Sequence, residues 1–149
     1  MGWRRWRRGG EAGERGASAL EFALIVPVLL LLFLGAVDFG QAIVLSNMAS
    51  EAARDGARKG IVTVTRHPDG TGAPTVTTAQ RDAIVAAARD KAGPWGDRFE
   101  VTVVPGYDSG SGGGQWVRVV VRGSYEPVTP RLLGINSVSV GAASKLYLP

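Results

Sequence analysis

The chain has 149 residues, a formal net charge of +4 at pH 7, no cysteine and a single histidine. Its length suits one modest domain, or a small domain joined to a tail or a membrane segment. The lack of cysteine excludes disulfide scaffolds, thiolate zinc sites, iron–sulfur clusters and cysteine nucleophiles, and one histidine leaves no histidine-rich metal site.

The positive charge is concentrated in residues 1–16, which contain five arginines and two glutamates. The rest of the chain has a net charge of only +1. Trp3 and Trp6 stand among these arginines beside an apolar run, and this combination suits a membrane interface at least as well as base stacking. We therefore expect a basic cytoplasmic leader over residues 1–16 and no nucleic-acid partner.

The apolar run extends from Phe22 to Val37, and its 16 residues contain no charge. A helix rises about 1.5 Å per residue, so a hydrocarbon core of about 30 Å needs about 20 residues. Ala17–Val37 supplies 21 residues if Glu21 is tolerated near the interface. The run predicts one transmembrane helix, and the arginines before it predict a cytoplasmic N-terminus with the C-terminal part outside.

A conventional secretory signal peptide has a similar basic region and apolar region. Two details argue against it here. No small-x-small cleavage site directly follows the run, where Ala36–Phe39 stands, and the acidic Glu21 comes immediately before it. A single-pass anchor that is never processed also stays open.

The junction before the run carries the most specific signal. Gly16 ends the basic leader, small residues beginning with Ala17 follow, and Glu21 and Phe22 lead into the run. This order of residues resembles the processing site of type IV prepilins, in which the glycine before the scissile bond gives the peptidase an unhindered, extended backbone. Glu21 lies one helical turn after Ala17, so its carboxylate is favoured by the helix dipole and can neutralise an amino terminus. The plain alternative is that Glu21 merely lies at the membrane interface.

Two further features mark the run itself. Pro27 removes a backbone hydrogen bond from the middle of the helix, and we expect it to kink the helix there. Asp38, Phe39 and Gly40 stand at the outer border of the predicted span.

These features together resemble the TadE-like family, minor pseudopilins of the tight-adherence (Flp) pilus machinery. The resemblance covers the chain from Arg15 to about Gly60, and Val117–Pro130 is similar to the end of that family in a less specific way. It implies cleavage after Gly16 by a prepilin peptidase on the cytoplasmic side of the cell membrane. It also implies partners among other pilins or pseudopilins and the Tad assembly platform.

The helical pattern continues beyond the predicted span. Small and apolar residues recur at spacings of three and four and form one stripe, which comprises Leu45, Met48, Ala49, Ala52, Ala53, Gly56 and Ala57. Gly60 predicts the helix stop. One helix over Ala17–Lys59 would be about 65 Å long, with an inner half in the membrane and an outer half that presents the stripe. Pilin-like subunits have this arrangement, by resemblance.

The remaining residues predict a small α+β domain outside the membrane. Ile61–Thr65 predicts a strand, and a turn-rich loop with His67 follows it. A capping box at Thr77–Gln80 predicts a helix to about Ala92, which Gly93-Pro94 ends. We expect Ile84, Val85 and Ala88 of this helix to be buried against a sheet.

Alternating patterns predict three antiparallel strands, centred on Phe99–Val103, Val117–Val121 and Val138–Ala142. A glycine-rich hairpin loop joins the first two, and an irregular segment over Pro127–Gly134 precedes the third. Such a small sheet needs a cover on its apolar face, and the outer half of the long helix is the expected cover.

The sequence thus predicts three parts: a leader over 1–16, a transmembrane and extended helix over 17–60, and an α+β domain over 61–149. No catalytic constellation is evident, because His67 lies in a turn and the glycine-rich loop lacks the lysine of a phosphate-binding loop. We expect no enzyme activity, cofactor, metal or small-molecule substrate. The competing class is an unprocessed, single-pass anchored interaction module.

Overall fold

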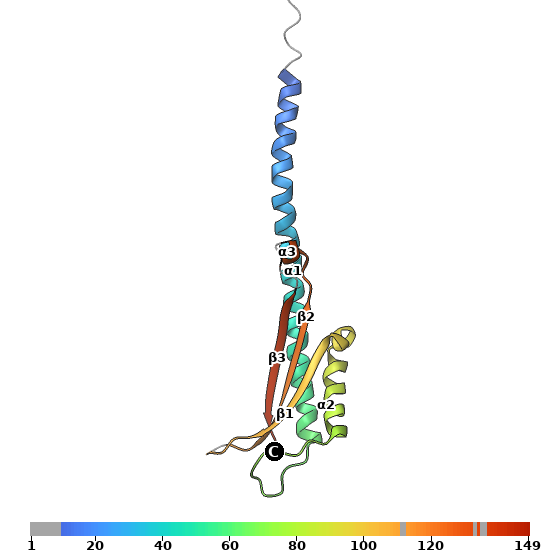
Figure 1. Ribbon diagram of the computed structural model, residues 1–149, viewed down its shortest axis with the longest axis vertical. Helices are drawn as coiled ribbons and strands as arrows, with labels where there is room; N and C mark the ends of the chain where they lie inside the picture. The colour runs from blue at the N-terminus through green and yellow to red at the C-terminus, as the bar shows by residue number, and fades with distance from the viewer. Residues whose placement is uncertain (1–9, 111–112, 133, 135–136) are drawn as a thin grey trace, which may run out of the picture.

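The computed structural model describes residues 10–110, 113–132, 134 and 137–149. Its first element, α1 (Gly10–Thr63), is a single helix of 54 residues, which corresponds to about 81 Å at 1.5 Å per residue. Figure 1 shows α1 as a long stalk, and the remaining elements gather along its second half. Most of the basic leader, residues 1–9, lies outside the described residues.

Six shorter elements follow α1. They are α2 (Thr78–Lys91), the 3₁₀ helix η1 (Gly93–Arg98), β1 (Phe99–Tyr107), β2 (Gln115–Tyr125), α3 (Val128–Leu132) and β3 (Val138–Tyr147). The strands form one antiparallel sheet in the order β1-β2-β3. The predicted fold class is confirmed, since a long apolar helix precedes one further main helix and a three-stranded open sheet.

The predicted strand over Ile61–Thr65 is wrong. Ile61–Thr63 forms the last turn of α1, and only Thr65 makes an isolated bridge, to Thr75. Gly60 therefore does not end the helix, contrary to the prediction. It is buried beneath the sheet, where an added Cβ would lie 3.0 Å from Val117 Cγ1. This glycine allows close packing, whereas the sequence pattern indicated a stop.

The capping box at the start of α2 is confirmed. The Gln80 backbone N–H donates to Thr77 Oγ1 at 3.3 Å, and the Thr77 backbone N–H donates to Gln80 Oε1 at 2.9 Å. Gln80 Nε2 also donates to the Thr63 carbonyl oxygen at 2.8 Å, which ties the start of α2 to the end of α1. The helix ends at Lys91 with Ala92 as its C-cap, close to the predicted end, and the positive φ of 57° at Gly93 suits a glycine.

The three predicted strands are confirmed, and each is longer than its alternating core. In the register, Val103 on β1 lies opposite Val119 on β2, which lies opposite Ser144 on β3. Part of the hairpin loop (Ser111 and Gly112) and part of the segment before β3 (residues 133, 135 and 136) lie outside the described residues. The segment predicted to be irregular contains the short helix α3.

The core lies between the inner face of the sheet and two helices, α1 and α2 (Figure 1). The predicted stripe supplies the α1 side, because all of its residues are buried except Met48, which is half-buried. At Gly56, an added Cβ would lie 3.1 Å from both Ala88 Cβ on α2 and Val119 Cγ1 on β2. Ile84 is also fully buried, whereas Val85 is half-buried. The long helix thus covers its own sheet.

Candidate functional site

The first half of α1 exposes large apolar side chains on every side. Those with at least half of their surface exposed between residues 20 and 44 are Leu20, Phe22, Leu24, Ile25, Val28, Leu29, Leu30, Leu32, Phe33, Phe39 and Val44. The most apolar window of the helix has a mean hydropathy of 2.6, and none of that window is buried. A helix that is apolar all round needs an apolar environment. We call residues 16–37 the apolar half of α1 and residues 38–63 its packed half.

The residues of the predicted cleavage motif lie at the start of this apolar half. Gly16, Ala17, Glu21 and Phe22 are all exposed and all helical. The backbone at Gly16 is therefore not extended, in contrast to the sequence-based expectation. An added Cβ at Gly16 would have no neighbouring atom within 4 Å, so this helix does not need a glycine there for packing.

Glu21 has no ion-pair or hydrogen-bond partner among the described residues. It stands one turn after Ala17 on the helix, as predicted, and its side chain is exposed. An unpaired carboxylate at the edge of an apolar helix is costly in a membrane. A partner outside the described residues, on this or another subunit, would remove that cost.

Pro27 lies inside α1, and the helix continues on both sides of it. The proline removes one hydrogen bond of the helical ladder, and in a membrane neighbouring groups can satisfy the freed carbonyl. The kink expected from the sequence stays a prediction.

From Gly16 onward, Asp38 is the first buried residue of α1, and it forms a joint with the segment that follows β2. Its Oδ1 accepts a hydrogen bond from the backbone N–H of Val128 at 3.0 Å, and its Oδ2 accepts one from that of Thr129 at 2.6 Å. The Tyr125 hydroxyl donates to the Asp38 carbonyl oxygen at 3.2 Å. We call these four residues the Asp38 joint.

The joint fixes where the apolar half of α1 ends and the packed part of the molecule begins. Hydrogen bonds to a carboxylate are stronger than those between neutral groups, so the two amides hold the β2–β3 connection against the helix. The other two residues of the border triplet do not take part. Phe39 is exposed, and an added Cβ at Gly40 would meet no atom within 4 Å. Of the predicted triplet, the structure therefore assigns a contact within the chain to Asp38.

A second polar cluster lies at the opposite end of the sheet. Asp108 accepts hydrogen bonds from Trp116 Nε1 at 2.9 Å, from the Tyr147 hydroxyl at 2.7 Å and from Lys145 Nζ. The Lys145 ammonium also lies 4.6 Å from the centre of the Trp116 ring and 4.8 Å from that of Tyr147. We call these four residues the Asp108 cluster.

Hydrogen bonds from Lys145, Tyr147 and Trp116, in that order of importance, lower the pKa of Asp108 to about 2. The hydrogen bond to Asp108 in turn raises the pKa of Lys145. Asp108 thus stays ionised and joins the end of β1 to the ends of β2 and β3.

The single histidine has a structural neighbour that the sequence did not reveal. Gln115 is fully buried, and its side-chain amide binds the backbone of His67: Oε1 accepts from the N–H at 2.9 Å, and Nε2 donates to the carbonyl oxygen at 3.2 Å. The loop between α1 and α2 is therefore held to the sheet through backbone groups of His67. Among the described residues, no group of three or more His, Cys, Asp or Glu could hold a metal ion.

Asp38 could be located from the sequence, but its partners could not. The weaker resemblance over Val117–Pro130 includes Tyr125, Val128 and Thr129, and it was the one signal of their importance. No sequence pattern indicated a structural role for Asp108 or Gln115, because both stand next to turns, where polar residues are common.

The structure defines a class of protein: one long helix with a bare apolar half near the N-terminus, and a small α+β unit built on its other half. This layout is compatible with a single-pass membrane anchor.

The family model described as TadE-like protein matches residues 16–58 of this chain. The resemblance to the TadE-like family is thereby confirmed over the segment that contains the cleavage motif, Pro27, the border triplet and most of the packed half. The match covers less than a third of the chain, and over these residues the chain is similar to TadE-like proteins. No curated protein and no solved structure matches the chain.

Proposed function

We propose that this protein is a pseudopilin-like component of a Tad (Flp) pilus assembly or a related secretion system. It is anchored in the cell membrane by the apolar half of α1, with its N-terminus in the cytoplasm and its sheet outside. It acts through assembly with other pilins or pseudopilins and with the assembly platform, and it has no catalytic role. The observation that carries the proposal is the family match that begins at Gly16 and runs along a helix whose most apolar window has no buried residue.

The helical state of the Gly16–Ala17 bond is consistent with cleavage by a prepilin peptidase. Gly10, Gly13 and Gly16 lie in the first turns of α1. Each glycine weakens a helix by about 1 kcal/mol relative to alanine, and helix ends fray. This end of α1 can therefore unwind at low cost and present the bond in an extended form.

Glu21 has the geometry for a role in assembly. Cleavage after Gly16 would expose the amino group of Ala17 one helical turn from the Glu21 carboxylate. The same carboxylate could instead pair with the amino terminus of a neighbouring subunit, which would align two helices in the membrane. The absence of a partner for Glu21 among the described residues leaves its carboxylate open to either contact.

The intact mass of the protein extracted from its native membrane tests the proposal. We expect a mass that lacks residues 1–16. Gly16→Leu should retain the full length, because a bulky side chain before the scissile bond hinders the peptidase. Gly13→Leu, the matched control, alters a neighbouring glycine of the same helix end and should be processed normally.

Other outcomes would contradict the proposal in distinct ways. A full-length wild-type chain would favour the unprocessed anchored interaction module. Loss of about 35–50 residues would indicate a conventional signal peptide. An unchanged mature form of Gly16→Leu would place the cleavage elsewhere.

A further inference from the structure

The two edges of the sheet differ in whether a further strand could pair with them. In the order β1-β2-β3, the outer strands β1 and β3 each have one side without a neighbouring strand. An edge strand presents unpaired backbone N–H and C=O groups, which can bind an extended segment of another chain.

The register identifies the backbone groups that face outward on β3. The Leu148 N–H donates to the Gln115 carbonyl oxygen at 2.8 Å, next to the pair formed by Tyr147 and Trp116. In an antiparallel pair, hydrogen-bonded and non-bonded residues alternate. The even-numbered residues of β3 therefore bond to β2, and the odd-numbered ones, Ser139 to Tyr147, direct their N–H and C=O groups toward the open edge.

The outward positions of β3 are accessible. Ser139, Gly141, Ala143 and Tyr147 are exposed, and Lys145 is half-buried. No described side chain forms a hydrogen bond with a backbone group of β3, and the strand contains no proline. An extended segment could therefore reach four or five consecutive outward positions.

The same alternation shows that the edge of β1 is closed. The odd-numbered residues of β2 bond to β3, so its even-numbered residues bond to β1. Their register partners on β1 are also even-numbered, so odd-numbered residues such as Val103 and Pro105 direct their backbone groups outward. Arg81 Nη1 of α2 donates to the Val103 carbonyl oxygen at 3.1 Å. Pro105 has no N–H to offer. The protein thus blocks one edge in two ways and leaves the other open.

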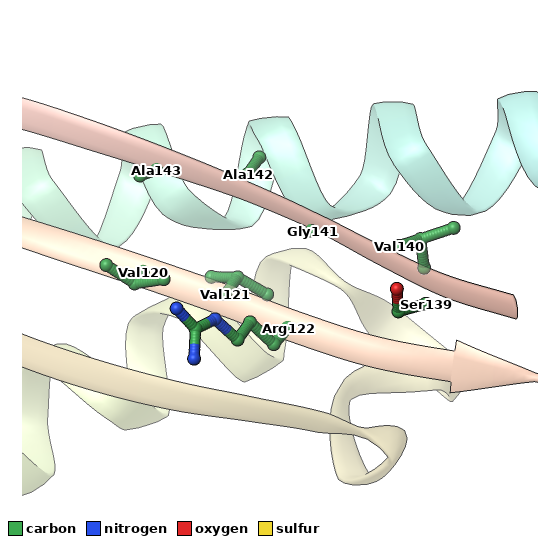
Figure 2. Close-up of a pocket in the computed structure, with 8 residues that line it drawn as sticks. All are labelled: Val120, Val121, Arg122, Ser139, Val140, Gly141, Ala142 and Ala143. Carbon is green, nitrogen blue, oxygen red and sulfur yellow. The ribbon is translucent and has the colours of Figure 1, made fainter.

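A shallow depression lies along β3 on the outer face of the sheet, and Figure 2 shows the residues that line it. Gly141 lies opposite Arg122 in the register, so no side chain of β3 separates Arg122 from the open edge. Arg122 is exposed and forms no ion pair among the described residues, although Glu100 is its register partner on β1. A glutamate on a fourth strand would lie two strand spacings from Arg122, about 9–10 Å between Cα atoms. An arginine and a glutamate side chain together are long enough to span that distance.

We propose that the open edge of β3 is a docking site for an extended, acidic segment of another protein, which pairs with β3 as a fourth strand and directs a carboxylate toward Arg122. This docking site deepens the proposed function. It rests on that function for one point only, which is that the partner lies outside the membrane. A second copy of the chain fits less well. β3 runs alongside α1 in the same direction (Figure 1), so copies in one membrane have parallel β3 strands, whereas two-fold edge pairing requires antiparallel ones.

The test uses the full chain in lipid nanodiscs and two synthetic peptides of about nine residues, the usual order of strand length. Both alternate valine and threonine with a serine at each end and have blocked termini, and they differ only in a central glutamate or glutamine on the threonine face. We expect the glutamate peptide to slow amide hydrogen exchange at Gly141, Ala143 and Lys145. Exchange at Ala142 and Ser144, which already bond to β2, should not change.

Two matched variants of the same residue separate pairing from packing. Ala143→Pro removes an outward N–H without removing a bond to β2, and it should weaken peptide binding at least about tenfold. Ala143→Thr keeps the N–H and favours a strand, so binding should stay within about twofold. Arg122→Gln should abolish the preference for the glutamate peptide, which we expect to be about two- to fivefold.

Several results would overturn the inference. They are unchanged exchange at the outward amides with the peptide present, equal binding by Ala143→Pro and Ala143→Thr, or equal binding of both peptides to the wild type. Concentration-dependent protection of the outward amides without peptide would assign the edge to a second copy instead. If Ala143→Pro does not fold, the exchange pattern of the wild type decides. The assay needs neither cleavage nor a pilus, so its failure is distinct from failure of the proposed function.

Discussion

The two halves of α1 belong to one unbroken helix but meet different surroundings. The apolar half carries leucine, isoleucine and phenylalanine around its whole circumference, and these side chains are exposed. The packed half replaces them with alanine and glycine on one face, where α2 and β2 approach to within van der Waals contact of Gly56. Large apolar residues serve a helix that is surrounded by an apolar environment, and small ones serve a helix that must lie close to its own domain.

The largest effect should come from the core beneath the packed half. Ile84 is fully buried, and its Cδ1 would lie 3.6 Å from a Cβ added at Gly60. Ile84→Ala should lower the free energy of unfolding of the helix–sheet unit by about 2–5 kcal/mol, because it leaves a cavity. Denaturant titration followed by near-UV circular dichroism in detergent would measure this. Leu29→Ala truncates a comparable side chain in the apolar half and should leave that unfolding transition unchanged.

A smaller effect is expected from overfilling the small-residue face. Ala53 is buried in the packed half, so Ala53→Leu should cost about 1–3 kcal/mol in the same unfolding assay. Ala23→Leu makes the identical change at an exposed position of the apolar half and should cost nothing. Equal losses for the two variants would show that the apolar half also packs tightly within the chain.

The Asp38 joint should have a local effect at the boundary between the halves. Asp38→Ala removes the acceptor for the amides of Val128 and Thr129, so both should exchange with solvent faster, while the amides of β2 near Val119 keep their protection. Asp38→Asn, which retains one side-chain oxygen acceptor, should show a smaller increase. Unchanged exchange in both variants would contradict the role of the carboxylate in holding this connection.

The smallest effect should come from the Asp108 cluster, at the end of the sheet farthest from the apolar half. The pKa of Asp108 falls from 3.8 to about 2 in the folded protein. A lowered folded-state pKa contributes stability above pH 3.8 that is lost as the pH falls toward 2. The thermal midpoint should therefore drop less steeply between pH 4 and pH 2 in Asp108→Asn than in the wild type. Parallel curves for the two proteins would show that the cluster adds no stability.

Much of the secondary structure could be predicted from the sequence because its signals are local. The capping box at Thr77 and Gln80, the alternation around Val119 and the stripe on α1 each depend on spacing within one element. The prediction failed at Gly60, where a glycine indicated a stop but the helix continued to Thr63. A glycine at a helix end and a glycine at a close helix–sheet contact have the same local pattern, and only the neighbour Val117 distinguishes them.

The candidate sites divide in the same way. The predicted cleavage motif and the role of Glu21 depend only on the order of residues along the chain, and both stay predictions. Asp38 could be located but not explained, because its partners Val128 and Thr129 stand 90 and 91 residues further along the chain. The residues of the Asp108 cluster come from β2, β3 and the end of β1, and no spacing relates them.

The sequence alone determined that this protein has one membrane-length apolar helix, a cleavage-like junction before it and a small α+β unit after it, because hydropathy, periodicity and capping are properties of neighbouring residues. The tertiary structure decided which face of the long helix covers the sheet, what the Asp38 carboxylate holds, and which of the two sheet edges stays open. These depend on contacts between residues far apart in the chain, where burial, hydrogen-bond geometry and strand register are set by packing rather than by local pattern.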